Sequence, residues 1–105
     1  MSETNARKEF LEHVQGKEVL CAKITMWSYD EQDFHVLDLK QRYTENDYIK
    51  FICELNFMYD QGSGIQNLFG TIWYTDGTWS SREEYDGSEW WLHNIRPDVP
   101  QELLP

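Results

Sequence analysis

The sequence predicts an α+β fold: an antiparallel sheet of five to six strands with one or two helices packed on one face. Two Asp-Gly pairs, Asp76-Gly77 and Asp86-Gly87, lie between strand-like runs. Such pairs favour hairpin turns, because a tight turn needs positive φ at its centre. Residues 18–28 alternate in side-chain polarity, as a half-buried strand does. Two further stretches have the apolar period of amphipathic helices.

The first predicted helix covers residues 4–15. Its apolar stripe consists of Phe10, Leu11 and Val14. Ser2 or Thr4 can cap the first turn, and Gly16 suits the left-handed position just past the end. A helix of about three turns is marginal alone in water, so this one is expected to depend on packing.

Two strands are predicted next, at residues 18–28 and 34–39, joined by a polar turn. The apolar side chains on one face of the first strand are those of Leu20, Ala22, Ile24 and Met26. The other face carries Val19, Cys21 and Trp27, so partial cover is expected there too.

Residues 44–56 fit either of two structures. As a helix, the stretch places Tyr48, Phe51, Ile52 and Leu55 on one face, and Thr44 with Asp47 resembles a capping box. As a strand, residues 49–59 alternate, but such a strand would be long. The length favours a helix over residues 45–55, followed by a short strand at 56–60.

A three-stranded meander is predicted in the C-terminal third of the chain. Residues 61–64 form a loop, and the strands cover residues 68–74, 78–85 and 88–93. Residues 94–105 are expected to form an extended tail, because each Pro fixes its own φ and disfavours helix at the residue before it. The length of 105 residues fits a single domain, residues 1–105.

The charge is strongly negative, with 19 acidic and 9 basic residues and a net charge of −10. The excess is concentrated in residues 30–60 and 69–93. Such a field repels nucleic acid and anionic membranes and attracts basic protein surfaces. The N-terminal stretch is polar and no apolar run is long enough for a membrane span, so a cytoplasmic location is expected. Cys21 and Cys53 lie in apolar runs and are expected to be buried, reduced thiols.

No motif predicts an enzyme, a cofactor or a metal site. The three histidines are far apart in sequence and no Cys-x-x-Cys is present. Residues 62–64 begin like a phosphate loop, but the third glycine and the P-loop lysine are missing. Neighbouring Glu83 and Glu84 would point to opposite faces of a strand, so they would not share a substrate.

The aromatic and acidic cluster in the meander is the candidate site. Its proposed partner-binding residues are Trp73, Trp79, Glu83, Glu84, Tyr85, Asp86, Glu89, Trp90 and Trp91. Strand alternation predicts that one member of each pair Trp73/Tyr74 and Trp90/Trp91 lies in the core, while its neighbour lies outside or under the N-terminal helix. Two interpretations remain open: helices cover both faces, or an aromatic patch is exposed, as patches used for binding are.

Residues 68–91, LFGTIWYTDGTWSSREEYDGSEWW, resemble segments of small uncharacterised bacterial and phage proteins. The shared positions are Phe69-Gly70, Trp73, Asp76-Gly77-Thr78-Trp79, Glu84-Tyr85-Asp86-Gly87 and Trp90-Trp91. The resemblance covers about a quarter of the chain. It implies a phage or mobile-element origin and no particular activity.

The expected function is that of a small acidic, non-enzymatic protein that binds a basic protein surface. It would act as an inhibitor or decoy of a nucleic-acid-binding protein, of the phage anti-defence or immunity type. The acidic residues would steer association and the aromatic residues would slow dissociation. Two alternatives remain: a homo-oligomeric accessory protein that uses its aromatic sheet face, and a small enzyme with a spatially assembled site. The chain would be a monomer or a homodimer.

Overall fold

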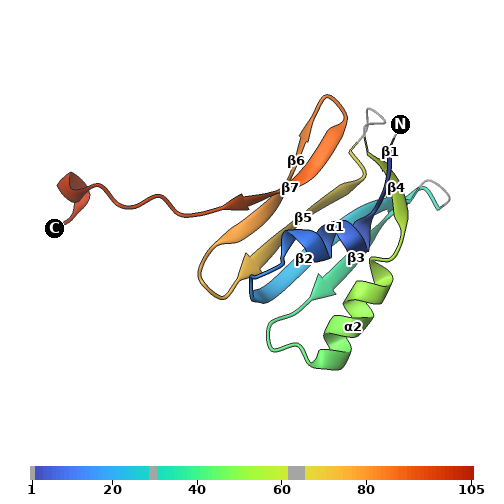
Figure 1. Cartoon of the computed structure of the whole chain (residues 1–105), viewed down its shortest axis with the longest axis horizontal. Coiled ribbons are helices and arrows are strands. Elements are labelled where there is room, and N and C mark those ends of the chain that lie inside the picture. Colours follow the sequence, from blue (N-terminus) through green and yellow to red (C-terminus); the bar gives the residue numbers. More distant parts are fainter. Residues whose placement is uncertain (1, 29–30, 62–65) are drawn as a thin grey trace.

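The computed structural model describes residues 2–28, 31–61 and 66–105 and has the α+β architecture expected from the sequence. Five antiparallel strands form the main sheet in the order β3-β2-β5-β6-β7, and β1 and β4 form a separate two-stranded sheet. The helices α1 and α2 lie on the same side of the main sheet (Figure 1). The opposite side of that sheet has no described helix or strand over it (Figure 1).

The N-terminal helix is shorter than expected, because the chain before it forms a strand. β1 (Ser2–Asn5) pairs antiparallel with β4 (Met58–Gln61), and α1 covers Ala6–His13. The N-cap residue is Asn5, whose side chain accepts a hydrogen bond from the backbone N–H of Lys8, so the expected position of the cap, at Ser2 or Thr4, is wrong. Strand pairing with β4 overrides the helical period at residues 4 and 5. Gly16 has φ +80°, the left-handed conformation expected just after the helix.

The first two long strands form an antiparallel pair. β2 covers Val19–Ser28 and β3 covers Asp33–Leu39. Ala22 and Ile24 of β2 are buried, as the alternation predicted. The register of β2 against β5 shifts between Val19 and Cys21.

The ambiguous stretch is a helix, α2 (Glu45–Glu54), and the capping box at Thr44 and Asp47 is present. Phe51 and Leu55 are buried under it. The ring centroids of Phe51 and Phe10 lie 5.6 Å apart in an edge-on arrangement, which joins the two helices on the same side of the sheet. The short strand predicted to follow is β4.

The C-terminal meander is confirmed. Its strands are β5 (Leu68–Tyr74), β6 (Trp79–Tyr85) and β7 (Ser88–Asn94). At the second turn, Asp86 and Gly87 have φ +52° and +87°, as a two-residue primed turn requires. At the first turn only Gly77 has positive φ, +87°, and its N–H bonds to the carbonyl of Tyr74 in a longer loop. The loop predicted at residues 61–64 lies largely outside the described residues.

The core lies between the main sheet and the two helices. Its fully buried side chains include Phe10 of α1, Ile24 of β2, and Leu68 and Ile72 of β5. After β7 the chain runs away from this body as residues 95–105 (Figure 1), ending in a short 3₁₀ turn at Gln101–Leu103. All residues of this tail are exposed. Among the described residues, no helix is long and apolar enough to cross a membrane.

The expectation for the cysteines is wrong in part. Both are free thiols, but Cys53 is exposed on α2 and Cys21 is half-buried. Cys53 sits in an apolar run of the sequence, but the helical turn places it away from the face that carries Phe51 and Leu55.

Candidate functional site

The side of the main sheet that faces away from the helices, termed the open face, carries a band of exposed apolar side chains. Alternation along the strands assigns residues to it, because neighbours on a strand point to opposite sides. Its large apolar members with at least 39% exposure are Phe34, Val36, Phe69, Trp73, Tyr85, Trp90 and Leu92. A contiguous apolar surface of this kind usually marks a binding site.

One group of rings lies where β2, β3 and β5 meet. Trp27 and Phe34 are directly opposite each other on paired strands, with ring centroids 4.9 Å apart in an edge-on arrangement. Phe69 meets Phe34 in the same way at 6.1 Å. Such contacts fix the ring orientations, so part of the ordering cost of binding is already met in the free protein.

A second group lies on β5, β6 and β7 and contains the residues selected from the sequence. Trp73 is directly opposite Trp79, and Glu83 is directly opposite Trp90. Glu83 also accepts a hydrogen bond from Ser81 Oγ on the same strand and face, at 2.9 Å. These residues therefore combine the exposed rings of Trp73 and Trp90 and the half-buried ring of Trp79 with a hydrogen-bonded carboxylate.

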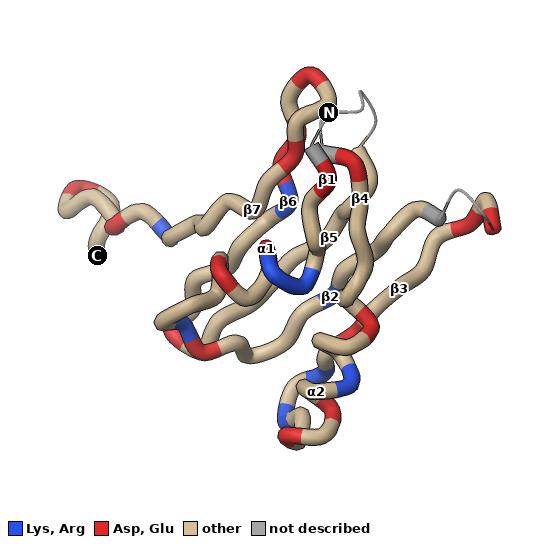
Figure 2. Tube along the Cα trace, turned by 45° about the vertical axis from the view of Figure 1, so that its right-hand side comes forward, with Lys and Arg blue, Asp and Glu red and all other residues tan. Residues whose placement is uncertain are grey.

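The remaining acidic residues of the predicted site gather at the tip of the β6–β7 hairpin. Glu84 and Asp86 are exposed there, beside Tyr85, which is 77% exposed. Glu84 accepts a hydrogen bond from the N–H of Gly87 and so also stabilises the turn. In Figure 2 the hairpin tip is coloured as acidic, at one end of the sheet.

Two residues proposed for partner binding are in the core, which corrects that part of the predicted site. Glu89 is 0% exposed and Trp91 is 7% exposed, both on the helix-covered face. The pairwise alternation was right, because Trp90 lies outside while Trp91 lies inside, and Trp73 lies outside while Tyr74 lies inside. The expectation for Glu89 is wrong because a buried cation pairs with its carboxylate.

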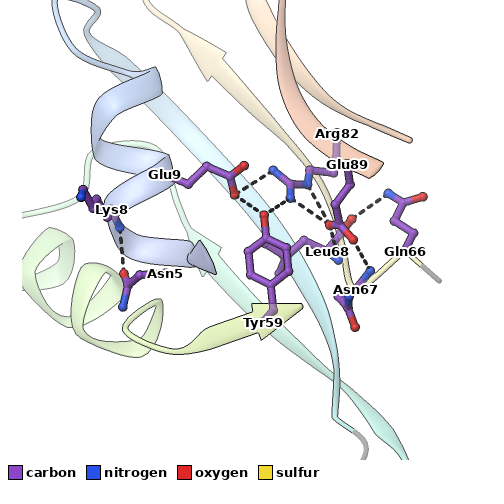
Figure 3. A network of polar contacts seen from close by, with 9 residues as sticks. All are labelled: Asn5, Lys8, Glu9, Tyr59, Gln66, Asn67, Leu68, Arg82 and Glu89. Atoms are coloured by element: carbon purple, nitrogen blue, oxygen red, sulfur yellow. Dashed lines mark hydrogen bonds and ion pairs between the residues drawn. The ribbon is translucent and has the colours of Figure 1, made fainter. Parts of the chain in front are cut away.

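That cation is Arg82, the centre of a buried polar network (Figure 3). Its guanidinium bonds to Glu89 Oε1 at 2.9 Å, to Tyr59 Oη at 2.5 Å, and forms an ion pair with Glu9 at 3.1 Å. Glu89 also accepts the backbone N–H groups of Asn67 and Leu68. The network joins α1, β4, β5, β6 and β7, so its role is to hold these elements together.

The environment of the network favours charged Arg82 and neutral Tyr59. Burial alone would lower the pKa of Arg82, but the nearby Glu9, Tyr59 and Glu89 more than offset this and raise it. Burial, together with the hydrogen bond to Glu9, raises the pKa of Tyr59 well above its ordinary value. The phenol therefore stays protonated and able to donate to Glu9.

A serine–histidine contact on the covered face resembles a nucleophile with its base. His13 Nε2 lies 2.7 Å from Ser80 Oγ, which lies 2.7 Å from Tyr74 Oη. Burial, then Lys17, His93 and Arg82, lowers the pKa of His13. However, Ser80 is 0% exposed, so a substrate cannot reach its oxygen in this conformation. The arrangement anchors α1 to β6.

A cavity of about 520 Å³ lies between α2 and the segment that joins β3 to α2. It is lined by residues of both charges, including Lys40, Arg42, Lys50 and Glu54. None of the predicted site residues lines it. Within residues 2–28, 31–61 and 66–105, no group of three or more His, Cys, Asp or Glu side chains is arranged to hold a metal ion.

Comparison of the chain with protein-family models, curated proteins and solved structures found no match. The geometry of the site therefore carries the functional argument.

Sequence reasoning missed the half of the open face contributed by β3 and the start of β5. Phe34, Val36 and Phe69 all lie there and are exposed. Phe34 and Val36 are two residues apart, so the period of two could have placed them on one face. The buried pair of Arg82 and Glu89 had no comparable signal, because pairing across a hairpin depends on the register.

Proposed function

We propose that this protein is a small acidic, non-enzymatic binding protein that holds a basic protein on the open face of its sheet. The partner class that fits best is a nucleic-acid-binding protein, whose basic surface the chain would occupy as an inhibitor or decoy. The observation that carries the proposal is the band of exposed rings on a sheet face that no described helix or strand covers.

The rings supply contact area. Aromatic side chains bury roughly 150–250 Å² each and dominate interface energetics. Trp73 and Trp79 are directly opposite each other beside the turn between β5 and β6, and Trp90 lies on the edge strand. Interface hot spots are enriched in Trp and Tyr.

The carboxylates supply the preference for a basic partner. Glu83 lies among the rings, and Glu84 and Asp86 lie at the hairpin tip. Lys23, a cation on the open face, forms an ion pair with Asp38 at 3.5 Å. With a net charge of −10 on the whole chain, a cationic surface is attracted from a distance. The two free thiols fit a reducing compartment, so the proposal takes the cytoplasm as the place of action.

The test compares variants of the two sides of the molecule in one capture experiment. The immobilised chain is incubated with nuclease-treated bacterial lysate, and each retained protein is purified and its affinity measured. Trp73→Ser removes a 43% exposed ring from the open face, and Leu11→Ser removes a 39% exposed side chain from α1 as a matched control. Glu83→Lys on the open face is matched by Glu12→Lys on α1.

The expected partner is a basic protein that the control variants bind like the unaltered chain. Trp73→Ser should weaken binding at least tenfold, mainly through faster dissociation, and Glu83→Lys should slow association. Raising the salt from about 50 to 500 mM should weaken binding, because screening shortens to a few Å. Saturable binding of purified DNA or RNA, or a partner equally sensitive to the α1 controls, would contradict the proposal.

A further inference from the structure

The two edges of the main sheet are protected to different degrees. At one edge, β3 carries Asp33 and Asp38 and packs against α2. At the other edge, β7 has no further strand beside it among the described residues. Natural sheets protect their edges with charges, bulges or covering elements, because an open edge presents backbone groups to another chain.

The backbone of β7 is ready for pairing. The two-residue turn at Asp86 and Gly87 makes the flanking Tyr85 and Ser88 a hydrogen-bonded pair. Hydrogen-bonded and non-hydrogen-bonded pairs then alternate along the hairpin. Trp91 and His93 fall at non-hydrogen-bonded positions, so their backbone N–H and C=O groups point to the outer edge.

The side chains of β7 do not oppose pairing with an identical strand. Its open-face residues are uncharged: Ser88, Trp90, Leu92 and Asn94. The one acidic side chain of the strand, Glu89, is buried and bonded to Arg82. In a chain with a net charge of −10, this edge is therefore a place where two copies can meet without direct repulsion between carboxylates.

We infer that β7 pairs with β7 of a second copy, antiparallel across a two-fold axis, so that the two sheets become one ten-stranded sheet. Full overlap places Trp91 on the axis, with its outward N–H and C=O groups bonded to those of Trp91 in the second copy. The same register sets Trp90 against Leu92 of the second copy on the open face, an apolar pair. A shift of one residue would bring open-face side chains against covered-face ones, so such a shift is excluded.

The consequence is a continuous open face of double width. The inference does not depend on the proposed function, but it gives a partner with two basic surfaces a bivalent site. The contact between the two copies and the binding of a basic partner should respond to salt in opposite directions. Each copy is strongly acidic, so screening the repulsion between copies should strengthen the dimer, whereas it weakens binding of a basic partner.

Light scattering coupled to size-exclusion chromatography tests the pairing with two lysine variants, whose replaced side chains are equally exposed in the unaltered chain. Leu92→Lys puts a charge at the seam of the two sheets, the device by which natural edges are protected. Trp73→Lys puts the same charge on the central strand β5 of the open face. The unaltered chain and Trp73→Lys should be dimers, with a dimer fraction that rises with salt, and Leu92→Lys should be a monomer.

Amide hydrogen exchange gives a second readout that does not need a variant. The N–H groups of Trp91 and His93 should become protected as the protein concentration rises, while the N–H of an exposed tail residue such as Val99 should exchange fast at every concentration. A monomer at all concentrations would overturn the inference. So would a dimer that Trp73→Lys dissociates and Leu92→Lys does not, because that pattern assigns the contact to the open face itself.

Discussion

The two faces of the main sheet are built from alternating residues of the same strands, yet they differ in the exposure of their apolar side chains and in the burial of their charged pairs. On the covered face, Ile24 and Ile72 are 0% exposed under the helices. On the open face, Trp73, one residue further along β5, is 43% exposed. These strands therefore carry more apolar side chains than the one core buries. The remaining apolar side chains are exposed on the open face.

The faces also differ in how they hold charge. The covered face encloses Arg82 and Glu89, which bond to each other, and Glu89 also accepts backbone N–H groups. The open face holds the pair Lys23–Asp38, whose side chains are 61% and 44% exposed. An exposed pair contributes about 0–1 kcal/mol, whereas breaking a buried pair costs about 3–5 kcal/mol, because a charge is left uncompensated.

The largest expected effect separates these two kinds of charge. Arg82→Met leaves Glu89 and Glu9 without their cation, and should lower the free energy of unfolding by about 3–5 kcal/mol. Glu83→Gln, the next residue on β6 but on the open face, should change it by less than about 0.5 kcal/mol. Urea unfolding measures both. Equal losses would mean that the two faces do not differ in the way described.

The next effect compares two glycines with positive φ. Gly70 of β5 has φ +152° and lies against β2, where an added Cβ would overlap the carbonyl oxygen of Lys23. Gly77 has φ +87° but open space around it. Gly70→Ala should therefore cost more than Gly77→Ala, for which the backbone strain alone is worth about 1 kcal/mol. Thermal unfolding of the two variants ranks them, and the reverse order would show that β5 can move away from β2.

The third effect is a pH dependence confined to the covered face. The pKa of His13 is lowered by burial and then by Lys17, His93 and Arg82, so the folded chain resists a proton that the unfolded chain binds below about pH 6.5. The contribution of His13 to stability is complete above that pH and is lost as the pH falls through the folded-state pKa. Urea unfolding at about pH 7 and 5.5 should show a smaller loss for His13→Gln than for the unaltered chain. An equal loss in both would assign the dependence to other groups.

Most of the fold could be predicted from local signals. The two Asp-Gly pairs located the meander, and the capping box at Thr44 and Asp47 identified a helix in a stretch that also alternates. The failures occurred where a distant strand decides. Residues 4 and 5 belong to a strand because β4 lies beside them, and the sequence near the N-terminus carries no sign of that partner.

The sequence could predict which residues of the candidate site share one side of the sheet, but not which side is exposed. Alternation stated that Trp90 and Trp91 lie on opposite sides, which is correct, but not which side the helices cover. The choice for Glu89 required knowing that Arg82 lies within bonding distance across the hairpin. A residue-type rule that places carboxylates outside fails where a buried cation is supplied by tertiary structure.

The smallest expected effect is a difference in labelling rate between the two thiols, which lie on opposite sides of the main sheet. Its measurement needs no substitution. Cys53 is exposed on α2, whereas Cys21 is half-buried on the open face, directly opposite Trp73. Burial raises the pKa of the Cys21 thiol, so less thiolate is present and labelling should be slower than at Cys53. Mass spectrometry after brief alkylation under native conditions should find a singly labelled chain modified at Cys53.

When a partner occupies the open face, labelling of Cys21 should slow further while that of Cys53 is unchanged, since α2 lies on the other side of the sheet. Protection of Cys53 instead would place the bound partner on the helices and remove the open face from the binding site.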